Sequence, residues 1–332
     1  MRYLVTGAAG FIGSMVVQQL LERGDEVLGV DNLNDAYDVR LKHWRLERLK
    51  GRERFQFDII DICDRTGLDR VFGAARPDGA GGAPFDGVLN LAARAGVRPS
   101  VENPWIYNDA NYTGTLNLLD LCVRHGVRKF VLSSTSSLYG GDNPRPYTES
   151  ANTDRPLSPY AVSKKAAEVL CYTYHYLYGI DVTVFRYFTV YGPAGRPDMS
   201  LFRFVQWISE GRPVRVFGDG RQERDFTFVE DVARGSIAGL KPVGYEVVNL
   251  GSDEPVVLLD AVRLIQQLTG REAQIEYSPM HKADVQATWA NISKAESLLG
   301  WRPQTDFREG VRRLVEWYDE NRAWARDIVT GV

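Results

Sequence analysis

The stretch VTGAAGFIGS, residues 5–14, joins a short apolar run to a helical pattern and carries Gly7, Gly10 and Gly13. Glycines in such a turn let the chain reverse tightly, let the backbone approach a pyrophosphate and let the helix pack closely on its strand. The N-terminus of the helix then faces the anion. Because tight turns favour glycine anyway, and because the spacing is G-x-x-G-x-x-G, the glycines alone are weak support for a dinucleotide site.

Outward from this turn, short apolar runs alternate with helical patterns through the first half of the chain. Strands that are apolar throughout and separated by helices are typical of a parallel sheet covered on both faces. The sequence therefore predicts an α/β protein with a Rossmann doubly wound parallel sheet. The runs are RYLVTG, EVLGVDN, RFQFDII, GVLNLAA, RKFVLSS and VTVFRYF.

The pattern loosens after about residue 189 into short strands and helices, whereas the apolar run at 246–250 is expected to return to the main sheet. We predict a Rossmann domain of residues 1–188 plus 229–257. A smaller, discontinuous C-terminal substrate domain is predicted for residues 189–228 plus 258–332. The Gly- and Pro-rich stretch at 73–87 is expected to be a surface loop.

A carboxylate at the end of the second strand indicates which dinucleotide is bound. Asp31 follows the glycines at about the 20-residue offset at which an acid accepts the adenosine ribose hydroxyls. An acid there repels a 2′-phosphate, so the sequence favours NAD over NADP. Further cofactor contacts are expected where the third and fourth strands end, at Asp58, Ile59, Leu91, Ala92 and Ala93.

Composition restricts the partners. The formal net charge is -3, so the chain offers no basic field for a nucleic-acid backbone. The cysteines, Cys63, Cys122 and Cys171, are far apart and show no metal-ligand spacing, so we expect reduced thiols and no metal site. No apolar run approaches the length of a membrane span, and no leader precedes the first strand. We expect a cytoplasmic protein without nucleic-acid or membrane partners.

The stretch SPYAVSKK places Tyr160 and Lys164 four residues apart, so the two side chains share one helix face. Because the chain has 16 tyrosines, a Y-x-x-x-K match is not rare, and a solvated helix face is the simple interpretation. The catalytic interpretation is that the nearby ammonium lowers the pKa of the phenol from about 10, which makes Tyr160 a base near neutral pH. Thr135, in the hydroxyl-rich stretch LSSTSSLYG at 132–140, ends the fifth strand and is expected to bond the same substrate oxygen.

Taken together, these motifs resemble the extended short-chain dehydrogenase/reductase family that acts on nucleotide sugars, over essentially the whole chain. GRQERDFTFVEDVARG at 220–235 also matches the pattern of that family. Within the family, the chain most resembles UDP-glucuronate 4-epimerases. The stretches that carry this finer resemblance are NLNDAYDVRLK at 32–42, LAARAGVRPS at 91–100 and RYFTVYGPAGRPDM at 186–199.

The resemblance implies roles for individual residues. Tyr160 would be the base, Lys164 its modulator and a ligand of the nicotinamide ribose, and Thr135 the hydroxyl partner. Because hydride leaves carbon 4 of the sugar and returns to it, NAD would stay tightly bound. The implied NAD ligands are Gly7, Gly10, Phe11, Ile12, Gly13, Asp31, Asn32, Asp58, Ile59, Leu91, Ala92, Ala93, Asn111, Tyr160, Lys164 and Tyr187. The implied UDP-sugar ligands are Arg98, Thr135, Ser136, Ser137, Tyr160, Thr189, Arg196, Val216, Phe217, Arg224 and Asp284.

The residues after Thr135 distinguish between related reactions. Sugar 4,6-dehydratases carry an Asp-Glu pair there and UDP-glucuronate decarboxylases carry a Glu, whereas this chain has Ser136 and Ser137. Neutral hydroxyls fit a uronate carboxylate, and UDP-glucose 4-epimerases typically have Asn where Thr189 stands. We therefore expect NAD-dependent 4-epimerisation of UDP-glucuronate to UDP-galacturonate through a transient 4-keto sugar.

Other interpretations stay open at this stage. The chain could be a UDP-glucose/UDP-galactose or broad-range UDP-sugar 4-epimerase, and less readily a UDP-glucuronate decarboxylase or a non-catalytic NAD-binding regulator. At MHKADV, residues 280–285, the family often has Gln or Arg where His281 stands, so contacts from this segment are open. Apolar faces at about 103–125 and 159–178 match those that pair across a two-fold axis in the family, which implies a homodimer.

Overall fold

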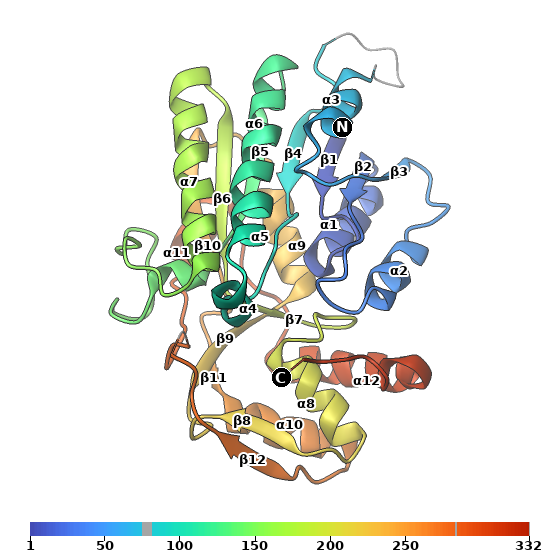
Figure 1. Cartoon of the computed structure of the whole chain (residues 1–332), viewed down its shortest axis with the longest axis vertical. Helices are drawn as coiled ribbons and strands as arrows, with labels where there is room; N and C mark the ends of the chain where they lie inside the picture. Colours follow the sequence, from blue (N-terminus) through green and yellow to red (C-terminus); the bar gives the residue numbers. More distant parts are fainter. Residues whose placement is uncertain (75–81, 283, 332) are drawn as a thin grey trace.

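In the computed structural model, which describes residues 1–74, 82–282 and 284–331, one seven-stranded sheet forms the centre of the larger lobe (Figure 1). Its strand order is β10-β6-β5-β4-β1-β2-β3, and every neighbouring pair is parallel. The predicted Rossmann doubly wound fold is therefore confirmed. Residues 75–81 of the loop expected at 73–87 lie outside the described residues.

The strands of this sheet correspond to the apolar runs of the sequence. Most positions of its central strands are buried, because helices cover both faces of the sheet. The run predicted to return late in the chain does so, since β10 pairs with β6 at the edge. The strands are β1 (Arg2–Thr6), β2 (Glu26–Asp31), β3 (Phe55–Ile59), β4 (Gly87–Asn90), β5 (Lys129–Thr135), β6 (Asp181–Tyr187) and β10 (Tyr245–Leu250).

Two groups of helices sandwich the sheet, each with its own buried apolar cluster. One face carries α1 (Phe11–Glu22), α9 (Val229–Ala238) and α11 (Ser293–Leu299). The other carries α3 (Arg65–Gly73), α6 (Gly114–Arg124) and α7 (Pro159–Tyr178). The remaining elements of this lobe are α2 (Arg40–Glu47), α4 (Val97–Glu102), α5 (Trp105–Tyr107), the π-helix η1 (Asn108–Thr113) and the 3-10 helix η2 (Ser136–Tyr139).

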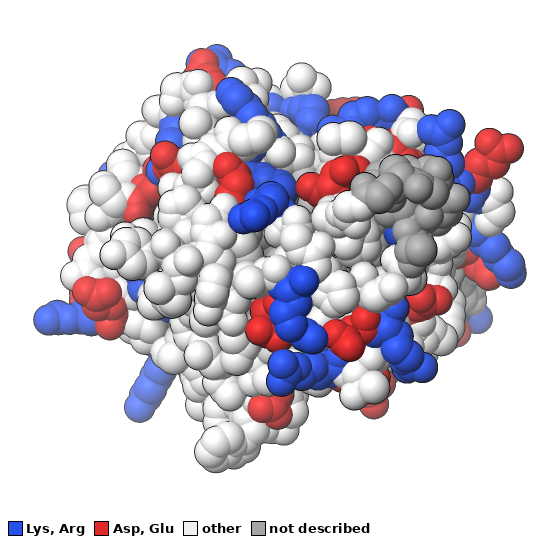
Figure 2. Space-filling model, turned by 90° about the horizontal axis from the view of Figure 1, so that it is seen from above, with Lys and Arg blue, Asp and Glu red and all other residues white. Residues whose placement is uncertain are grey.

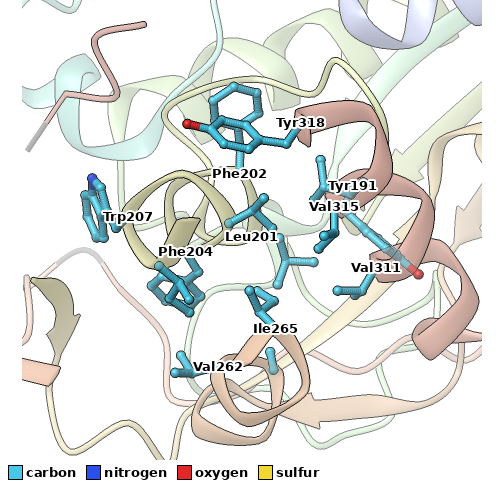
Figure 3. Packing of buried hydrophobic residues seen from close by; sticks show 14 of the residues in the cluster. Tyr191, Leu201, Phe202, Phe204, Trp207, Val262, Ile265, Val311, Val315 and Tyr318 are labelled. Atoms are coloured by element: carbon cyan, nitrogen blue, oxygen red, sulfur yellow. The ribbon is translucent and has the colours of Figure 1, made fainter. Parts of the chain in front are cut away.

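A smaller lobe lies below the carboxyl ends of the strands in Figure 1. Its core is a third apolar cluster, in which Phe202 and Phe204 of α8 lie among side chains of α10 and α12 such as Val262 and Val315 (Figure 3). Two small sheets complete it. Its elements are β7 (Thr189–Tyr191), α8 (Ser200–Ser209), β8 (Val214–Phe217), β9 (Glu223–Phe228), β11 (Pro255–Val257), α10 (Leu258–Thr269), β12 (Ile275–Ser278) and α12 (Phe307–Ala325).

The division of the chain into residues 1–188 plus 229–257 and residues 189–228 plus 258–332 stays a proposal. Two segments contact the part to which they were not assigned. β11, assigned to the first part, pairs with β9 of the smaller lobe, and α11, assigned to the second part, packs on α9 and β10 of the larger lobe. On the face seen in Figure 2, Lys and Arg are interspersed with Asp and Glu and form no field of one sign. Among the described residues, no helix combines the length and apolar composition that a membrane crossing needs.

Gly13 provides a test of how tightly the first turn is packed. A Cβ at this position would collide with the carbonyl oxygen of Gly7, a backbone atom that cannot move aside. We expect Gly13→Ala to lower the free energy of unfolding by about 1–3 kcal/mol in urea denaturation. Gly73→Ala is the control, because its added Cβ meets no described atom within 4 Å beyond its chain neighbours and its own helix backbone; equal losses in both variants would contradict the packing argument.

Candidate functional site

The glycine turn between β1 and α1 forms a cradle of backbone. Gly7 has a φ of +68°, and a Cβ on it would lie 2.7 Å from the amide nitrogen of Ala92, just after β4. A side chain there would be both strained and obstructed. Gly10 precedes the first turn of α1, whose N-terminus opens onto the same space. These features fit an anionic diphosphate held by backbone amides and a helix N-terminus.

The parallel register brings the ends of the central strands to one edge of the sheet. Thr6 lies beside Val30 of β2 and Asn90 of β4. Its hydroxyl donates to Asn90 Oδ1 at 2.7 Å and accepts from the amide of Ala92 at 3.1 Å. These bonds fix the loop that begins with Leu91, where cofactor contacts were predicted.

Asp31 ends β2 at this edge and is buried, with 7% of its surface exposed. Its Oδ1 accepts from the amide of Leu33 at 2.8 Å and from Nζ of Lys42 in α2 at 3.2 Å. Sequence reasoning placed Asp31 at the strand end but missed Lys42. The missing signal is the fold of the 32–39 segment, which turns α2 back over the strand end.

The other predicted cofactor residues occupy less uniform positions. Asp58 and Ile59 end β3, and the Ile59 side chain is 69% exposed. The Asn111 amide is engaged by protein, since it bonds the backbone of Arg94 and, at 2.9 Å, the hydroxyl of Ser163. The remaining predicted ligands lie in the first turn of α1, directly after β2, after β4, in α7 and at the end of β6: Phe11, Ile12, Asn32, Ala93, Tyr160, Lys164 and Tyr187. The phenol of Tyr187 bonds Ser236 of α9.

Tyr160 and Thr135 meet because α7 begins beside the end of β5. The hydroxyl of Ser158 accepts from the amide of Ala161 and caps α7, with Pro159 in its first turn, so Tyr160 is held close to the cap. Thr135 caps η2 by accepting from the amide of Ser137 at 3.1 Å. Its hydroxyl donates to Ser137 Oγ at 3.1 Å and also interacts with the Tyr160 phenol, where it lowers the pKa.

The titration of Tyr160 differs from the sequence expectation. Burial raises the pKa of its phenol above 10, while the hydrogen bond from Thr135 and the charge of Arg196 oppose this rise. Lys164 was expected to lower the pKa of Tyr160, but its ammonium is not among the groups that do so here. Its Nζ instead points to the hydroxyl of Ser133 at 3.4 Å.

Lys164 is buried next to a further ion pair that the sequence analysis missed. Burial lowers the pKa of Lys164 to about 8, and the charge of Glu168 opposes this fall. Glu168 accepts from the guanidinium of Arg186 on β6 at 2.8 Å and from Ser134 at 2.6 Å. The spacing of four residues from Lys164 to Glu168 was a readable signal, because it puts both side chains on one helix face.

The residues predicted to bind the UDP-sugar lie on both lobes. Arg98 of α4 donates to Asp284 at 2.6 Å and stacks over the ring of Phe217 in β8 at 4.0 Å. Arg98 and Phe217 also line an open pocket of about 580 Å³, together with Val101, Leu157, Pro279, Met280, His281 and Lys282. The predicted segment around His281 therefore borders this pocket.

The remaining predicted ligands differ in how they are engaged. Val216 is fully buried in the core of the smaller lobe, so its backbone alone is available. Arg224 donates to the carbonyl oxygen of Glu223 at 2.8 Å. Arg196 forms an ion pair with Asp198 at 2.5 Å, yet its charge also acts on Tyr160. Ser136 and Ser137 lie in η2, directly after Thr135, and Thr189 begins β7.

Arg45, a residue that the sequence analysis did not single out, joins the cofactor loop to the smaller lobe. This buried guanidinium donates to the carbonyl oxygen of Ala9 at 3.1 Å and to that of Ala194 at 2.7 Å. A further bond, of 2.7 Å, goes to the hydroxyl of Tyr37. The glycine turn and the loop that leads to Arg196 are thus held by one side chain. Within the described residues, no group of three His, Cys, Asp or Glu side chains is arranged to hold a metal ion.

The glycine cradle, the buried acid at the end of β2 and the Tyr160–Lys164 pair define a dinucleotide-binding protein of the short-chain dehydrogenase/reductase type. The family model described as GDP-mannose 4,6 dehydratase matches residues 4–314. The chain belongs to this family of extended short-chain dehydrogenase/reductases, as the sequence motifs predicted.

Individual relatives cover nearly the whole chain. A UDP-glucuronate 4-epimerase of Thermodesulfobacterium geofontis is 55% identical over 320 residues, which span 96% of each protein. The crystal structure of UDP-glucuronic acid 4-epimerase from Bacillus cereus, in complex with UDP-glucuronic acid and NAD, is 35% identical with a TM-score of 0.88, and the match covers 97% of this chain and 100% of that one. A UDP-glucose 4-epimerase from Thermotoga maritima with UDP-glucose is 32% identical, with a TM-score of 0.87 over 97% and 99% of the two chains.

The buried ammonium of Lys164 leads to a stability prediction. The folded protein releases this proton near pH 8 and the unfolded chain near 10.5, so folding is penalised below pH 8 and the penalty falls as the pH rises towards 10.5. We expect Lys164→Met to raise the free energy of unfolding at pH 7 by up to about 3 kcal/mol, because a neutral side chain escapes the penalty.

Urea unfolding of nucleotide-free wild type and Lys164→Met between pH 7 and 10.5 measures this difference. The advantage of the variant should shrink as the pH rises. A constant or growing advantage would contradict the assignment of a depressed pKa to Lys164. The exposed Lys50, which pairs with Glu47 on the surface, supplies the control variant Lys50→Met.

Proposed function

We propose that this protein is an NAD-dependent isomerase that interconverts UDP-glucuronate and UDP-galacturonate by inverting carbon 4 of the sugar. The observation that carries the proposal is the run of hydroxyls at Thr135, Ser136 and Ser137 beside Tyr160, without an acid in the run. The relatives that act on UDP-glucuronate, at 55% and 35% identity, support the same substrate. The glycine cradle and Asp31 support NAD as the cofactor, and the NAD ligands predicted from the sequence are its proposed contacts.

Tyr160 is the proposed base. Its phenolate takes the proton from the sugar 4-hydroxyl, and the hydroxyl of Thr135 holds the same oxygen. Arg196 supplies positive charge that favours the phenolate over the phenol. Bound NAD would accept the hydride that leaves carbon 4 of the sugar, and its oxidised ring would add a positive charge.

The 4-keto sugar must turn about its link to the diphosphate so that its other face meets the cofactor. Arg98 and Arg224 are the proposed diphosphate ligands, because guanidinium groups bind phosphate oxygens bidentately. Asp284 holds the guanidinium of Arg98, and the ring of Phe217 flanks that guanidinium. The backbone around Val216 is proposed to contact uracil. After the turn, carbon 4 would take back the hydride on its other face while Tyr160 returns its proton to the carbon-4 oxygen, so no net redox change occurs.

The carboxylate of the sugar decides between epimerisation and loss of carbon dioxide. A carboxylate next to a 4-ketone is a β-keto acid, and it breaks when its bond to carbon 5 aligns with the carbonyl π-system. Ser136, Ser137 and Thr189 are proposed to hold the carboxylate in the sugar plane as neutral donors. Because none of these hydroxyls performs acid-base chemistry at its ordinary pKa, dehydration and decarboxylation are both disfavoured.

Removal of the Tyr160 hydroxyl tests the proposed base. We expect Tyr160→Phe to lower kcat by about 10²–10⁴-fold, the usual contribution of general acid-base catalysis, with little change in UDP-sugar binding. The measurement is capillary electrophoresis of UDP-glucuronate and UDP-galacturonate over time. Tyr178→Phe, which removes a phenol from the surface end of the same helix, is the control. Unchanged turnover in Tyr160→Phe would assign the proton transfer to another residue, whereas no turnover even in wild type would leave the chain as a non-catalytic nucleotide-binding protein.

The same assay tests the substrate. We expect turnover of UDP-glucuronate to exceed that of UDP-glucose, because the hydroxyls around the sugar are arranged for an anion. Release of carbon dioxide should stay far below epimerisation. A much larger turnover of UDP-glucose would assign the protein to the neutral or broad-range 4-epimerases, and release of carbon dioxide as the main outcome would assign it to the decarboxylases.

We propose that two copies of the chain form a homodimer through α6 and α7, which lie side by side in Figure 1. One face of α7 exposes apolar side chains at spacings near a heptad: Val162, Val169 and Tyr176 are 53%, 53% and 76% exposed. A single soluble chain rarely leaves so much contiguous apolar surface open.

UDP-sugar substrates and three free thiols, two of them buried, support a reducing, cytoplasmic location.

A charge on this face tests the dimer. We expect Val169→Arg to shift the protein from dimer to monomer in sedimentation velocity, because the interface would have to bury an unpaired guanidinium. Val329→Arg, at an exposed position far along the chain, should leave the dimer intact. A Val169→Arg protein that sediments as wild type does would place the interface elsewhere.

A further inference from the structure

Lys42 of α2 lies at the edge of the cofactor site without a role in the proposed reaction. Its ammonium is buried, with 4% of the residue exposed. Nζ lies 3.2 Å from Oδ1 of Asp31 and 3.3 Å from Oδ1 of Asn34, and it sits 5.6 Å from the centre of the Tyr37 ring. Two of its three donors thus point at oxygens around the end of β2.

The hydrogen bonds to Asp31 are unequally shared between its two oxygens. Within the described part of the chain, Oδ1 accepts both hydrogen bonds of this carboxylate, one from the backbone amide of Leu33 and one from Lys42. Oδ2 is therefore the oxygen available to the adenosine ribose hydroxyls that an acid at this position accepts. The ammonium of Lys42, 3.2 Å from Oδ1, therefore lies on the same carboxylate that would receive the ribose hydroxyl to which NADP attaches its 2′-phosphate.

The other charged groups at this edge are engaged differently. The guanidinium of Arg45 is committed to the carbonyl oxygens of Ala9 and Ala194 and to the Tyr37 hydroxyl. Asp61 Oδ2 accepts from the side-chain Nδ2 of Asn32 at 2.7 Å, which places a second carboxylate on this side. Lys42 is thus the cation here whose partner is the ribose-binding carboxylate itself.

We propose that Lys42 is a cofactor-specificity residue: paired with Asp31 it positions that carboxylate for the ribose of NAD, and without the charge of Asp31 it becomes a ligand for the 2′-phosphate of NADP. The proposal rests on the NAD site of the proposed function and is independent of which sugar is turned over. The pair is close to neutral, so Asp31 repels a 2′-phosphate less than an unpaired acid would. Removing the carboxylate charge leaves a buried cation, which a dianionic phosphate satisfies by a charge-assisted hydrogen bond.

The test uses the full-length protein and measures bound nucleotide rather than activity. Wild type, Asp31→Asn, Lys42→Met and the double variant are each incubated with NAD and a large excess of NADP until the bound ratio is constant. The protein is then separated from free nucleotide and denatured, and the released NAD and NADP are quantified by chromatography. Lys50→Met, which removes an exposed ammonium that pairs with Glu47, is the control and should match wild type.

Each variant has a defined expectation. Asp31→Asn should raise the ratio of bound NADP to NAD by about tenfold or more, the effect of one hydrogen bond to a charged group. Lys42→Met should lower this ratio below that of wild type, because Asp31 is then unpaired. The double variant should lose the gain seen in Asp31→Asn.

Three outcomes would overturn the proposal. They are an equal ratio in Asp31→Asn and the double variant, a Lys42→Met ratio equal to that of wild type, and an Asp31→Asn protein that is folded but holds neither nucleotide. A wild type that holds no nucleotide at all would instead remove the NAD site, and with it the proposed function. Normal nucleotide ratios in a protein that is inactive on UDP-glucuronate would leave the role of Lys42 intact.

Discussion

The contact between the backbone of Gly13 and the carbonyl oxygen of Gly7 is the constraint on which the site depends. It draws α1 onto β1 so closely that no side chain fits between them, and it aims the helix N-terminus at the ends of the parallel strands. Because the strands of the seven-stranded sheet all run the same way, Asp31, Thr135 and Tyr187 then end at one edge of it. The cofactor site and the reacting tyrosine are two consequences of the same close packing.

Burial acts on the reacting groups in two directions. It raises the pKa of Tyr160 and lowers that of Lys164, so in each case it favours the neutral form. The hydrogen bond from Thr135 and the charge of Arg196 oppose this effect at Tyr160, and the charge of Glu168 opposes it at Lys164. The buried Glu168–Arg186 pair therefore belongs to the electrical environment of the site as much as to the core.

Patterns that are local in the sequence were predictable, and contacts made by chain reversal were not. Alternating apolar runs predicted the parallel sheet, and the spacing of Tyr160 and Lys164 predicted a shared helix face, because both depend on the period of one element. Lys42 and Arg45 were missed because their partners lie 11 and 149 residues away and meet them only after α2 folds back. The effect of Lys164 on Tyr160 was predicted from spacing alone, whereas burial, which spacing does not reveal, dominates the pKa of both groups.

The bonds from Arg45 to Ala9 and Ala194 join the glycine turn of the larger lobe to the loop of the smaller lobe that leads to Arg196. The loop around Ala194 is thereby tied to the glycine turn of the other lobe through one buried guanidinium. The two lobes are therefore not interchangeable modules: a chimera that takes its smaller lobe from a relative would need matching carbonyl oxygens opposite Arg45. Among relatives that share this junction, changes in sugar preference are expected to accumulate inside the smaller lobe, while the contacts of Arg45 with the two loops stay fixed.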